Sequence, residues 1–237
     1  MTSLKDKTVL IIGRGSGIAR AIALAVSDNG GRVIAAGRHP DDLAGAYRGT
    51  EIGIERADVT DESSIAALAD RIGTVDHVVS TASARARGGF ADLTASLVNA
   101  SFATKVTGPL LLAKHFAAKL EAGGSFLFMS GATALKPAPG MLAVAATNAA
   151  VDAVTAGLAV ELAPIRVNAI APGTIDTGAY DGLGDERKAA LFGARSAANP
   201  ARRIGTADDI AAVALAALTN GFLTGVSMPV DGGEHLV

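Results

Sequence analysis

The sequence predicts an α/β protein built on a Rossmann-type, doubly wound parallel sheet with helices on both faces. Short β-branched runs alternate along the chain with longer Ala- and Leu-rich helical patterns, which is typical of βαβ units. The runs are apolar almost throughout, as expected for strands that are buried on both faces. The first run, residues 9–12, leads directly into a glycine-rich turn and then into a helical pattern.

The alternation places seven strands and six helices along the chain. Strands are predicted at residues 9–12, 32–36, 52–55, 77–80, 125–129, 166–170 and 225–230. Helices are predicted at residues 17–28, 40–47, 62–72, 91–118, 142–163 and 207–218. Pro109 falls inside the fourth helical pattern, and since proline removes an interior hydrogen bond, we expect a break or kink there.

Composition limits the class of protein. The 237 residues are 49% hydrophobic and carry a formal net charge of -2 from 21 basic and 23 acidic side chains. Such a chain can bury a large core, so one domain over residues 1–237 is expected. Basic and acidic residues are mixed along the chain, so the sequence shows no basic cluster of the kind that binds nucleic acid or an anionic membrane. There is no cysteine, the four histidines lack ligand spacing, and the N-terminus lacks a signal segment, so we expect a cytoplasmic protein without a metal site.

The junction between the first strand and the first helix suits a nucleotide. A helix N-terminus offers unpaired N–H groups and a positive dipole end, and glycines let a pyrophosphate approach the backbone. The sequence reads Gly13-x-x-x-Gly17 and departs from the pattern Gly-x-Gly-x-x-Gly, because Ile18 stands at the last position. By itself this motif is weak, and an ordinary strand-to-helix turn is the alternative.

Residues that follow the second and third strands bear on the choice of nucleotide. Arg38 stands where an NAD-binding protein places a carboxylate against the ribose 2′-hydroxyl. A cation there favours a 2′-phosphate, so NADP(H) is expected over NAD(H), and Arg14 could assist. The alternative for Arg38 is a solvated loop arginine. Asp58 could accept a hydrogen bond from an adenine amino group, and Asp61 could cap the next helix.

Further motifs resemble the short-chain dehydrogenase/reductase family over essentially the whole chain. The matching segments are Gly13-x-x-x-Gly17, Asp58-Val59, Asn168 followed by Pro172-Gly173 and Ile175-Asp176-Thr177, Arg203-Ile204-Gly205, Asp209-Ile210-Ala211, Thr224-Gly225 and Val230-Asp231-Gly232-Gly233. The resemblance implies a sheet of strand order 3-2-1-4-5-6-7, a nicotinamide cofactor across the carboxyl ends of the strands, and a homo-oligomer, usually a tetramer, with a dimer as the alternative. It also implies contacts of Gly13, Ser16, Gly17 and Ile18 with the pyrophosphate, of Asp58 and Val59 with adenine, and of Pro172, Gly173, Ile175 and Thr177 with the nicotinamide.

The chain departs from the family at its catalytic positions. Where the family has Asn-Asn-Ala-Gly, this chain has Ser80-Thr81-Ala82-Ser83. Contact with the cofactor through Thr81, Ala82 and Ser83 is still expected, since the backbone makes much of it. The asparagine, serine, tyrosine and lysine that carry the family's catalysis fall on Lys105, Gly131, Val144 and Asn148.

Four residues are candidates for the lost chemistry. In the family a tyrosine hydroxyl passes a proton to the carbonyl oxygen, and a lysine lowers its pKa and holds the nicotinamide ribose. Lys105 becomes a substitute acid if it is buried, the alternative being a solvated lysine or an oligomer contact. Asn148 could form a hydrogen bond with a ribose hydroxyl. The Ser130 hydroxyl could form a hydrogen bond with a substrate oxygen, the alternative being that Ser130 only caps the end of its strand. Tyr180 lies in a glycine-rich lid expected at residues 178–200, where it could supply a phenol or pack the lid.

These observations favour an NADP(H)-dependent oxidoreductase with a remodelled active site. Its substrate is expected to be a small carbonyl compound, imine or activated alkene, with no nucleic acid or membrane partner. Two alternatives stay open: a non-redox isomerase, cyclase or lyase on the same scaffold, and an NADP-binding regulatory protein. The fold alone does not decide among the three.

Overall fold

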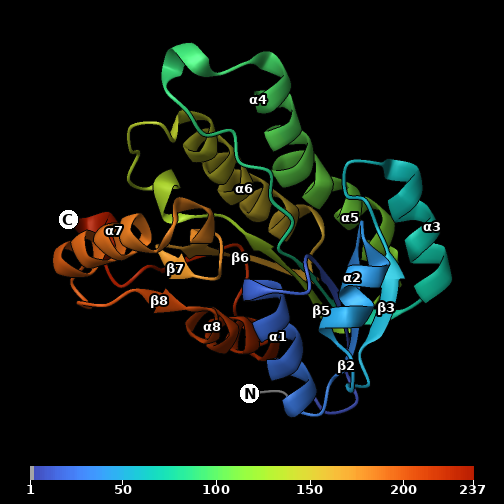
Figure 1. Cartoon of the computed structure of the whole chain (residues 1–237). Coiled ribbons are helices and arrows are strands. Elements are labelled where there is room, and N and C mark those ends of the chain that lie inside the picture. Colours follow the sequence, from blue (N-terminus) through green and yellow to red (C-terminus); the bar gives the residue numbers. More distant parts are fainter. Residues whose placement is uncertain (1–2) are drawn as a thin grey trace.

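The computed structural model describes residues 3–237 and has helices on both sides of a central sheet (Figure 1). The sheet has seven parallel strands in the order β3-β2-β1-β4-β5-β6-β9. In chain order these are β1 (Thr8–Ile12), β2 (Arg32–Gly37), β3 (Gly53–Arg56), β4 (Val75–Ser80), β5 (Leu120–Met129), β6 (Arg166–Pro172) and β9 (Ser227–Val230). The predicted fold and strand order are confirmed, β9 being the seventh strand of the main sheet. β7 (Ile175–Asp176) and β8 (Gly205–Thr206) form a separate two-stranded sheet that the sequence analysis lacks.

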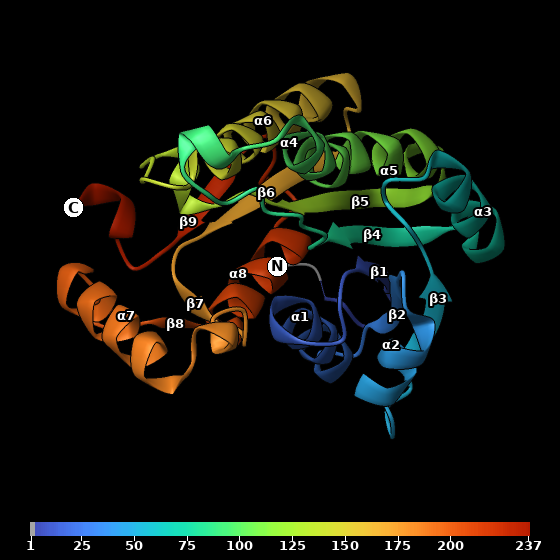
Figure 2. The same cartoon turned by 45° about the horizontal axis from the view of Figure 1, so that its top comes forward.

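The helices form one layer on each face of the sheet (Figure 2). The first layer comprises α1 (Gly17–Asp28), α2 (Pro40–Ala46) and α8 (Ala207–Thr219), and the second comprises α3 (Glu62–Ile72), α5 (Gly108–Phe116) and α6 (Leu142–Glu161). On β5, Leu127 packs with the first layer, whereas Phe126 and Phe128 pack with the second. Because successive strand residues point to opposite faces, a strand in this position must be apolar at every residue.

The structure corrects the long helix predicted at residues 91–118. Its place is taken by α4 (Ala95–Phe102), a π-helical turn over Ala103–Thr107, and α5, which begins at Gly108. The irregular turn therefore precedes Pro109. The ring of a proline clashes with the carbonyl four residues earlier, which is that of Lys105, so the helix widens over the turn that contains this lysine.

A second difference lies in the segment expected to be a lid. It contains α7 (Asp185–Ala198), which was not predicted as a helix. The sequence shows only a short amphipathic stretch around Leu191 and Phe192. These two side chains are half-buried and none in α7 is buried, so the apolar stripe is short for a helix of this length.

Helix α6 is unusually long and apolar. It is the one helix in the described part of the chain that is long and apolar enough to cross a membrane. In this fold it lies against the sheet, and Asn148 and Thr155 are among its buried residues. Packing in the core accounts for part of its apolar character, since 39% of its most apolar window is buried within the described structure.

Candidate active site

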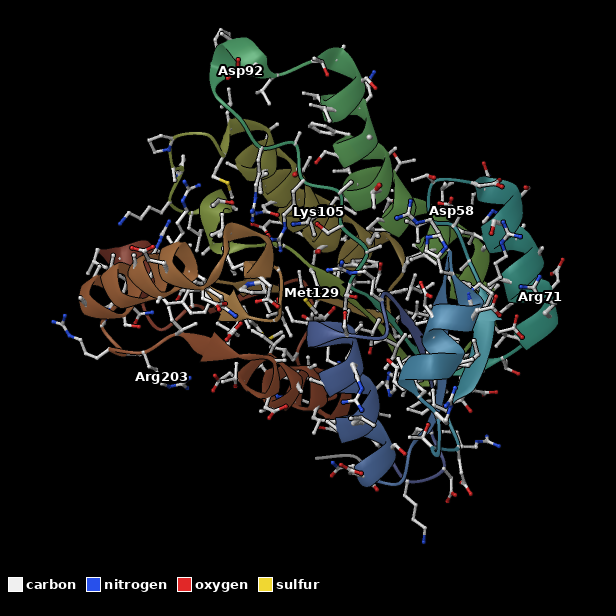
Figure 3. The ribbon with its side chains drawn as sticks, in the orientation of Figure 1. Asp58, Arg71, Asp92, Lys105, Met129 and Arg203 are labelled. Atoms are coloured by element: carbon white, nitrogen blue, oxygen red, sulfur yellow. The ribbon has the colours of Figure 1, made fainter. Side chains whose placement is uncertain are left out.

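One cavity of about 1030 Å³ lies along the edge of the sheet where the parallel strands end. It is lined by the last residues of four strands, Ile12, Gly37, Met129 and Pro172, at the edge where open α/β sheets bind ligands. Figure 3 shows Lys105 and Met129 near the middle of the molecule, and Asp58 toward β3. Every site residue predicted from the sequence lines this cavity: Gly13, Arg14, Ser16, Gly17, Ile18, Arg38, Asp58, Val59, Thr81, Ala82, Ser83, Lys105, Ser130, Asn148, Pro172, Gly173, Ile175, Thr177 and Tyr180.

The glycine-rich turn presents the N-terminus of α1 to the cavity. Ser16 is the N-cap residue, but its side chain makes no capping hydrogen bond, and the first turn holds no acidic residue. Gly17 has φ +57 and lies so close to Thr177 that a Cβ would approach its side chain to 2.9 Å. Only glycine adopts this conformation and tolerates this approach easily. The N–H groups of the first turn are therefore available for an anion.

Arg38 and Asp58 lie at the β2–β3 end of the cavity. Within residues 3–237, the Arg38 guanidinium has no hydrogen bond or ion pair. The Asp58 carboxylate accepts hydrogen bonds from the N–H of Thr60 at 2.9 Å and from its hydroxyl at 2.7 Å. The hydroxyl bond is the main reason why the pKa of Asp58 is lowered, and the charge of Arg38 contributes. The unpaired Arg38 guanidinium and the ionised Asp58 carboxylate therefore lie close enough for their charges to interact.

Lys105 is the most unusual residue of the site. It lies in the π-helical turn and is 6% exposed. Its ammonium donates to the carbonyl oxygen of Ser130 at 2.9 Å and to Oδ1 of Asn148. No carboxylate forms an ion pair with it among the described residues. The alternative interpretation of Lys105 as a solvated lysine or an oligomer contact is therefore wrong, because its side chain is buried.

Burial is the main cause that lowers the pKa of Lys105 to about 7, because it penalises the charged form. The positive charge of Arg85 lowers this pKa further, whereas the carboxylate of Asp152 raises it. An amine with this pKa exchanges a proton readily near neutral pH, which is the property required of a general acid.

The side chain of Asn148 is engaged within the protein. Its Oδ1 accepts from Lys105, and its Nδ2 donates to the hydroxyl of Thr133 at 2.7 Å. In the structure it therefore positions the lysine, with one amide hydrogen left for a ligand. A Cβ at Gly131 would lie 2.5 Å from Nδ2 of Asn148, so a larger residue at position 131 would displace this amide from its present position.

Ser130 and Tyr180 are less favourably placed than Lys105. The Ser130 hydroxyl donates to the backbone carbonyl of Asn148 at 3.1 Å, so its proton is already used, as in the capping alternative. The Tyr180 ring packs edge-on against Phe192 of α7 at 5.4 Å, and the Arg87 guanidinium lies 6.0 Å from its centroid. These contacts correspond to the lid-packing alternative for Tyr180.

Several cavity residues were missed by the sequence analysis. Arg85 and Arg87 follow β4, and Lys136 precedes α6. The Arg-Ala-Arg spacing after a strand was a readable signal. Near the other end of the chain, Glu234 accepts from the N–H of Thr174 at 2.9 Å and forms an ion pair with Arg195 of α7. That contact joins segments far apart in sequence and left no local pattern.

The fold and the site together define a class. A doubly wound parallel sheet, an uncapped helix N-terminus after the first strand and a cavity across the strand ends are features of a nucleotide-binding α/β protein. The family model described as enoyl-(acyl carrier protein) reductase matches residues 12–235. The chain belongs to the short-chain dehydrogenase/reductase family.

Individual relatives agree with this assignment. A short-chain dehydrogenase/reductase from Acremonium sp. (ucsE) is 31% identical, with 98% of this chain and 96% of the relative covered. The 1-cyclohexenylcarbonyl-CoA reductase of Streptomyces collinus is 30% identical, with 100% and 89% covered. A crystal structure of a small-chain dehydrogenase in complex with NADPH superposes with a TM-score of 0.84 at 32% identity, with 98% of this chain and 100% of that chain covered. These relatives support an oxidoreductase.

Proposed function

We propose that this protein is an NADPH-dependent oxidoreductase that reduces a small carbonyl compound, imine or activated alkene, with Lys105 as its proton donor. The observation that carries the proposal is the position of the Lys105 ammonium. It lies in the wall of the cavity, bonded to Ser130 and Asn148, with a pKa lowered to about 7.

The residues present fit a nicotinamide dinucleotide. The uncapped N-terminus of α1 can receive the pyrophosphate, and the unpaired Arg38 can receive a 2′-phosphate. The Asp58 carboxylate remains an acceptor for the adenine amino group. When bound, the reduced cofactor would supply a hydride. The NADPH-bound relative supports this choice of cofactor.

Lys105 compensates for the residues that the chain lacks. Position 148, where the family has its catalytic lysine, is occupied by asparagine, yet the Lys105 ammonium is bonded to that asparagine. The cation has thus moved from α6 to the π-helical turn while staying beside residue 148. Two of its three N–H groups are bonded to Ser130 and Asn148, which leaves the third for the substrate.

In this mechanism the protonated Lys105 donates its free N–H to the atom that gains negative charge during hydride addition. For a ketone that atom is the alkoxide oxygen, and Lys105 is left as the neutral amine, which regains a proton from solvent. Burial makes both protonation states accessible near pH 7. An iminium ion needs no proton, because hydride addition alone neutralises it.

The names of the matching family model and of one relative support an activated alkene as substrate. The matching family model is described as an enoyl-(acyl carrier protein) reductase, and the Streptomyces collinus protein as a 1-cyclohexenylcarbonyl-CoA reductase. Reduction of a conjugated alkene places negative charge first on the carbonyl oxygen, where a single buried ammonium can stabilise it.

The proposal is tested by deuteride transfer from NADPH labelled at C4 to a panel of ketones, enones and cyclic imines. The expected result is transfer from one face of the nicotinamide ring, with weaker activity on simple ketones. The Lys105→Met variant should lose activity on ketones, whereas Lys5→Met, which removes an exposed lysine outside the cavity, should keep it. Failure of every substrate class to oxidise bound NADPH would overturn the proposal.

A further inference from the structure

The segment of residues 81–89, here named the 81–89 loop, is held in place at several points. The N–H of Thr81 donates to the carbonyl of Ile12 at 2.8 Å. The fully buried Ser101 donates its hydroxyl to the carbonyl of Ala84 at 2.7 Å. The N–H of Gly88 donates to the carbonyl of Gly140 at 3.0 Å. A loop fixed in this way holds the side chains between its anchors near one position.

Arg85 and Arg87 lie between these anchors. They flank Ala86, which is 2% exposed, and the N–H of Arg87 donates to the carbonyl of Arg85 at 3.1 Å. Both arginines line the main cavity, and both also line an adjoining hollow of about 550 Å³. The buried alanine packs the loop against the protein while the two cations face ligand space.

Neither guanidinium is neutralised by the protein. In the part of the chain that the structure describes, Arg85 and Arg87 have no ion pair and no side-chain hydrogen bond, apart from the contact of Arg87 with the Tyr180 ring. Both side chains are exposed to solvent. Partial desolvation among neighbouring atoms lowers the pKa of Arg85, the positive charges of Arg87 and Arg14 lower it further, and Tyr180 opposes the shift. Unpaired guanidinium groups this close together repel each other, and an anion between them would relieve the repulsion.

The carboxylates that line the cavity form no ion pair with Arg85 or Arg87 in the described part of the chain. Within residues 3–237, three carboxylates line the cavity. Asp42 lies in the first turn of α2, which follows β2, Asp58 accepts hydrogen bonds from Thr60, and Glu234 is bonded to Thr174 and to Arg195. The hollow beside the arginines is lined by Arg14, Ser16, Arg85, Arg87, Thr177, Gly178 and Ala179, with no acidic residue. The positive charge of Arg85 also acts on Lys105, so these cations are neighbours of the proposed proton donor.

We propose that the substrate carries a carboxylate or phosphate group, which Arg85 and Arg87 bind beneath Tyr180 while the reacting atom faces Lys105. This proposal rests on the proposed function, and it names the substrate class of the same site. The planar fork of a guanidinium matches both oxyanions. The pyrophosphate of the cofactor is the competing anion for these arginines, because Arg14 and Ser16 border the same hollow.

The test compares a carboxylate with a neutral carboxamide of nearly the same shape, and with a phosphate as a second anion. Protein saturated with NADP⁺ is titrated by calorimetry with 4-oxocyclohexanecarboxylate, with its neutral carboxamide and with cyclohexyl phosphate. The same ketone pair is assayed for NADPH oxidation. Arg85→Met and Arg87→Met are compared with wild type and with Arg48→Met, which removes an exposed arginine that does not line the cavity.

The expected result is tighter binding of the carboxylate or the phosphate than of the carboxamide by about tenfold or more, the usual strength of one charge-assisted contact. Arg85→Met and Arg87→Met should each remove most of this preference, leave carboxamide binding within about twofold, and leave NADPH affinity within about threefold. The Arg48→Met variant should behave as wild type.

Two results would overturn the inference while leaving the proposed function intact. One is equal binding of the carboxylate and carboxamide by wild-type protein that still oxidises NADPH. The other is a loss of NADPH affinity in both arginine variants with unchanged carboxylate preference, which would assign the arginines to the pyrophosphate. Failure of wild-type protein to bind NADPH would contradict the proposed function itself, and fluorescence titration of NADPH measures that separately.

Discussion

Replacing Lys105 with methionine tests the central residue of the site. In the proposed mechanism, reduction of a ketone by the wild type requires the ammonium form of Lys105, whose pKa is lowered to about 7 by burial. The rate should therefore be constant at lower pH and fall about tenfold per pH unit above about pH 7. In Lys105→Met the rate near pH 6 should drop by at least about tenfold, and up to about 10⁴-fold, the range for a lost general acid. Stopped-flow absorbance of NADPH between pH 5.5 and 9.5 measures both effects.

The same substitution has a thermodynamic signature. The difference between the usual pKa of 10.5 and the value of about 7 corresponds to at most about 5 kcal/mol. Between these pH values the unfolded chain binds a proton that the folded protein does not, so stability rises with pH across this window. At pH 7 and below, the buried charge carries its full cost. Methionine removes this cost but leaves two carbonyl oxygens without a partner, at about 1–3 kcal/mol each.

We therefore expect Lys105→Met to be about as stable as wild type or up to about 3 kcal/mol more stable at pH 6, and to lose the rise in stability above pH 7. Urea unfolding at pH 6, 8 and 9.5 measures this, with Lys5→Met as the control for removal of an exposed amine. Rapid ketone reduction by Lys105→Met, with the pH profile of the wild type, would refute the reasoning. The same holds if stability depends on pH identically in both proteins.

Four further predictions follow from other parts of the molecule. Arg38→Asp should reduce the preference for NADPH over NADH by about ten- to hundredfold in fluorescence titrations, whereas equal affinities in the wild type would contradict the 2′-phosphate role. Burial lowers the pKa of His77 to about 4, so the free energy of unfolding should fall by about 3 kcal/mol between pH 6.5 and pH 4, because the unfolded chain takes up the proton first. His77→Phe should reduce this dependence of stability on pH in urea titrations. An unchanged dependence would assign it to other groups. Gly131→Ala should destabilise by about 1–3 kcal/mol through contact with Asn148, and a melting temperature equal to wild type would show that Asn148 moves freely. Sedimentation at micromolar concentration should give a dimer or tetramer, a prediction that a monomer would refute.

The fold was largely predictable because buried parallel strands leave short continuous apolar runs and amphipathic helices leave a periodic pattern. The helix over Glu62–Ile72 was predicted with its observed bounds, and Asp61 caps it through the N–H groups of Ser63 and Ser64, as expected. The π-helical turn and α7 were not predicted. The first arises because Pro109 acts on the turn before it, and the second has no buried side chain to create a pattern.

The site was predictable as a set of residues but not as a network. Sequence reasoning placed the glycine-rich turn, Arg38 and Lys105 at one edge of the sheet, and the structure brings them into one cavity. It did not foresee that Asn148 bonds Lys105, because residues 43 positions apart in the chain show no local spacing rule. Arg85 and Arg87 were overlooked although an Arg-Ala-Arg segment follows a predicted strand, because an irregular loop has no periodicity that shows which side chains face a cavity.

The close approach of Gly131 and Asn148 sets an order for changes in this active site. A serine at position 131 needs a Cβ that would lie 2.5 Å from Nδ2 of Asn148. A mutational route from this site toward a serine at position 131 must therefore displace the Asn148 amide or change residue 148 first, and either change disturbs the bond between residue 148 and Lys105. A directed-evolution library that varies position 131 alone should favour glycine, whereas one that varies positions 105, 131 and 148 together can reach both arrangements without this contact.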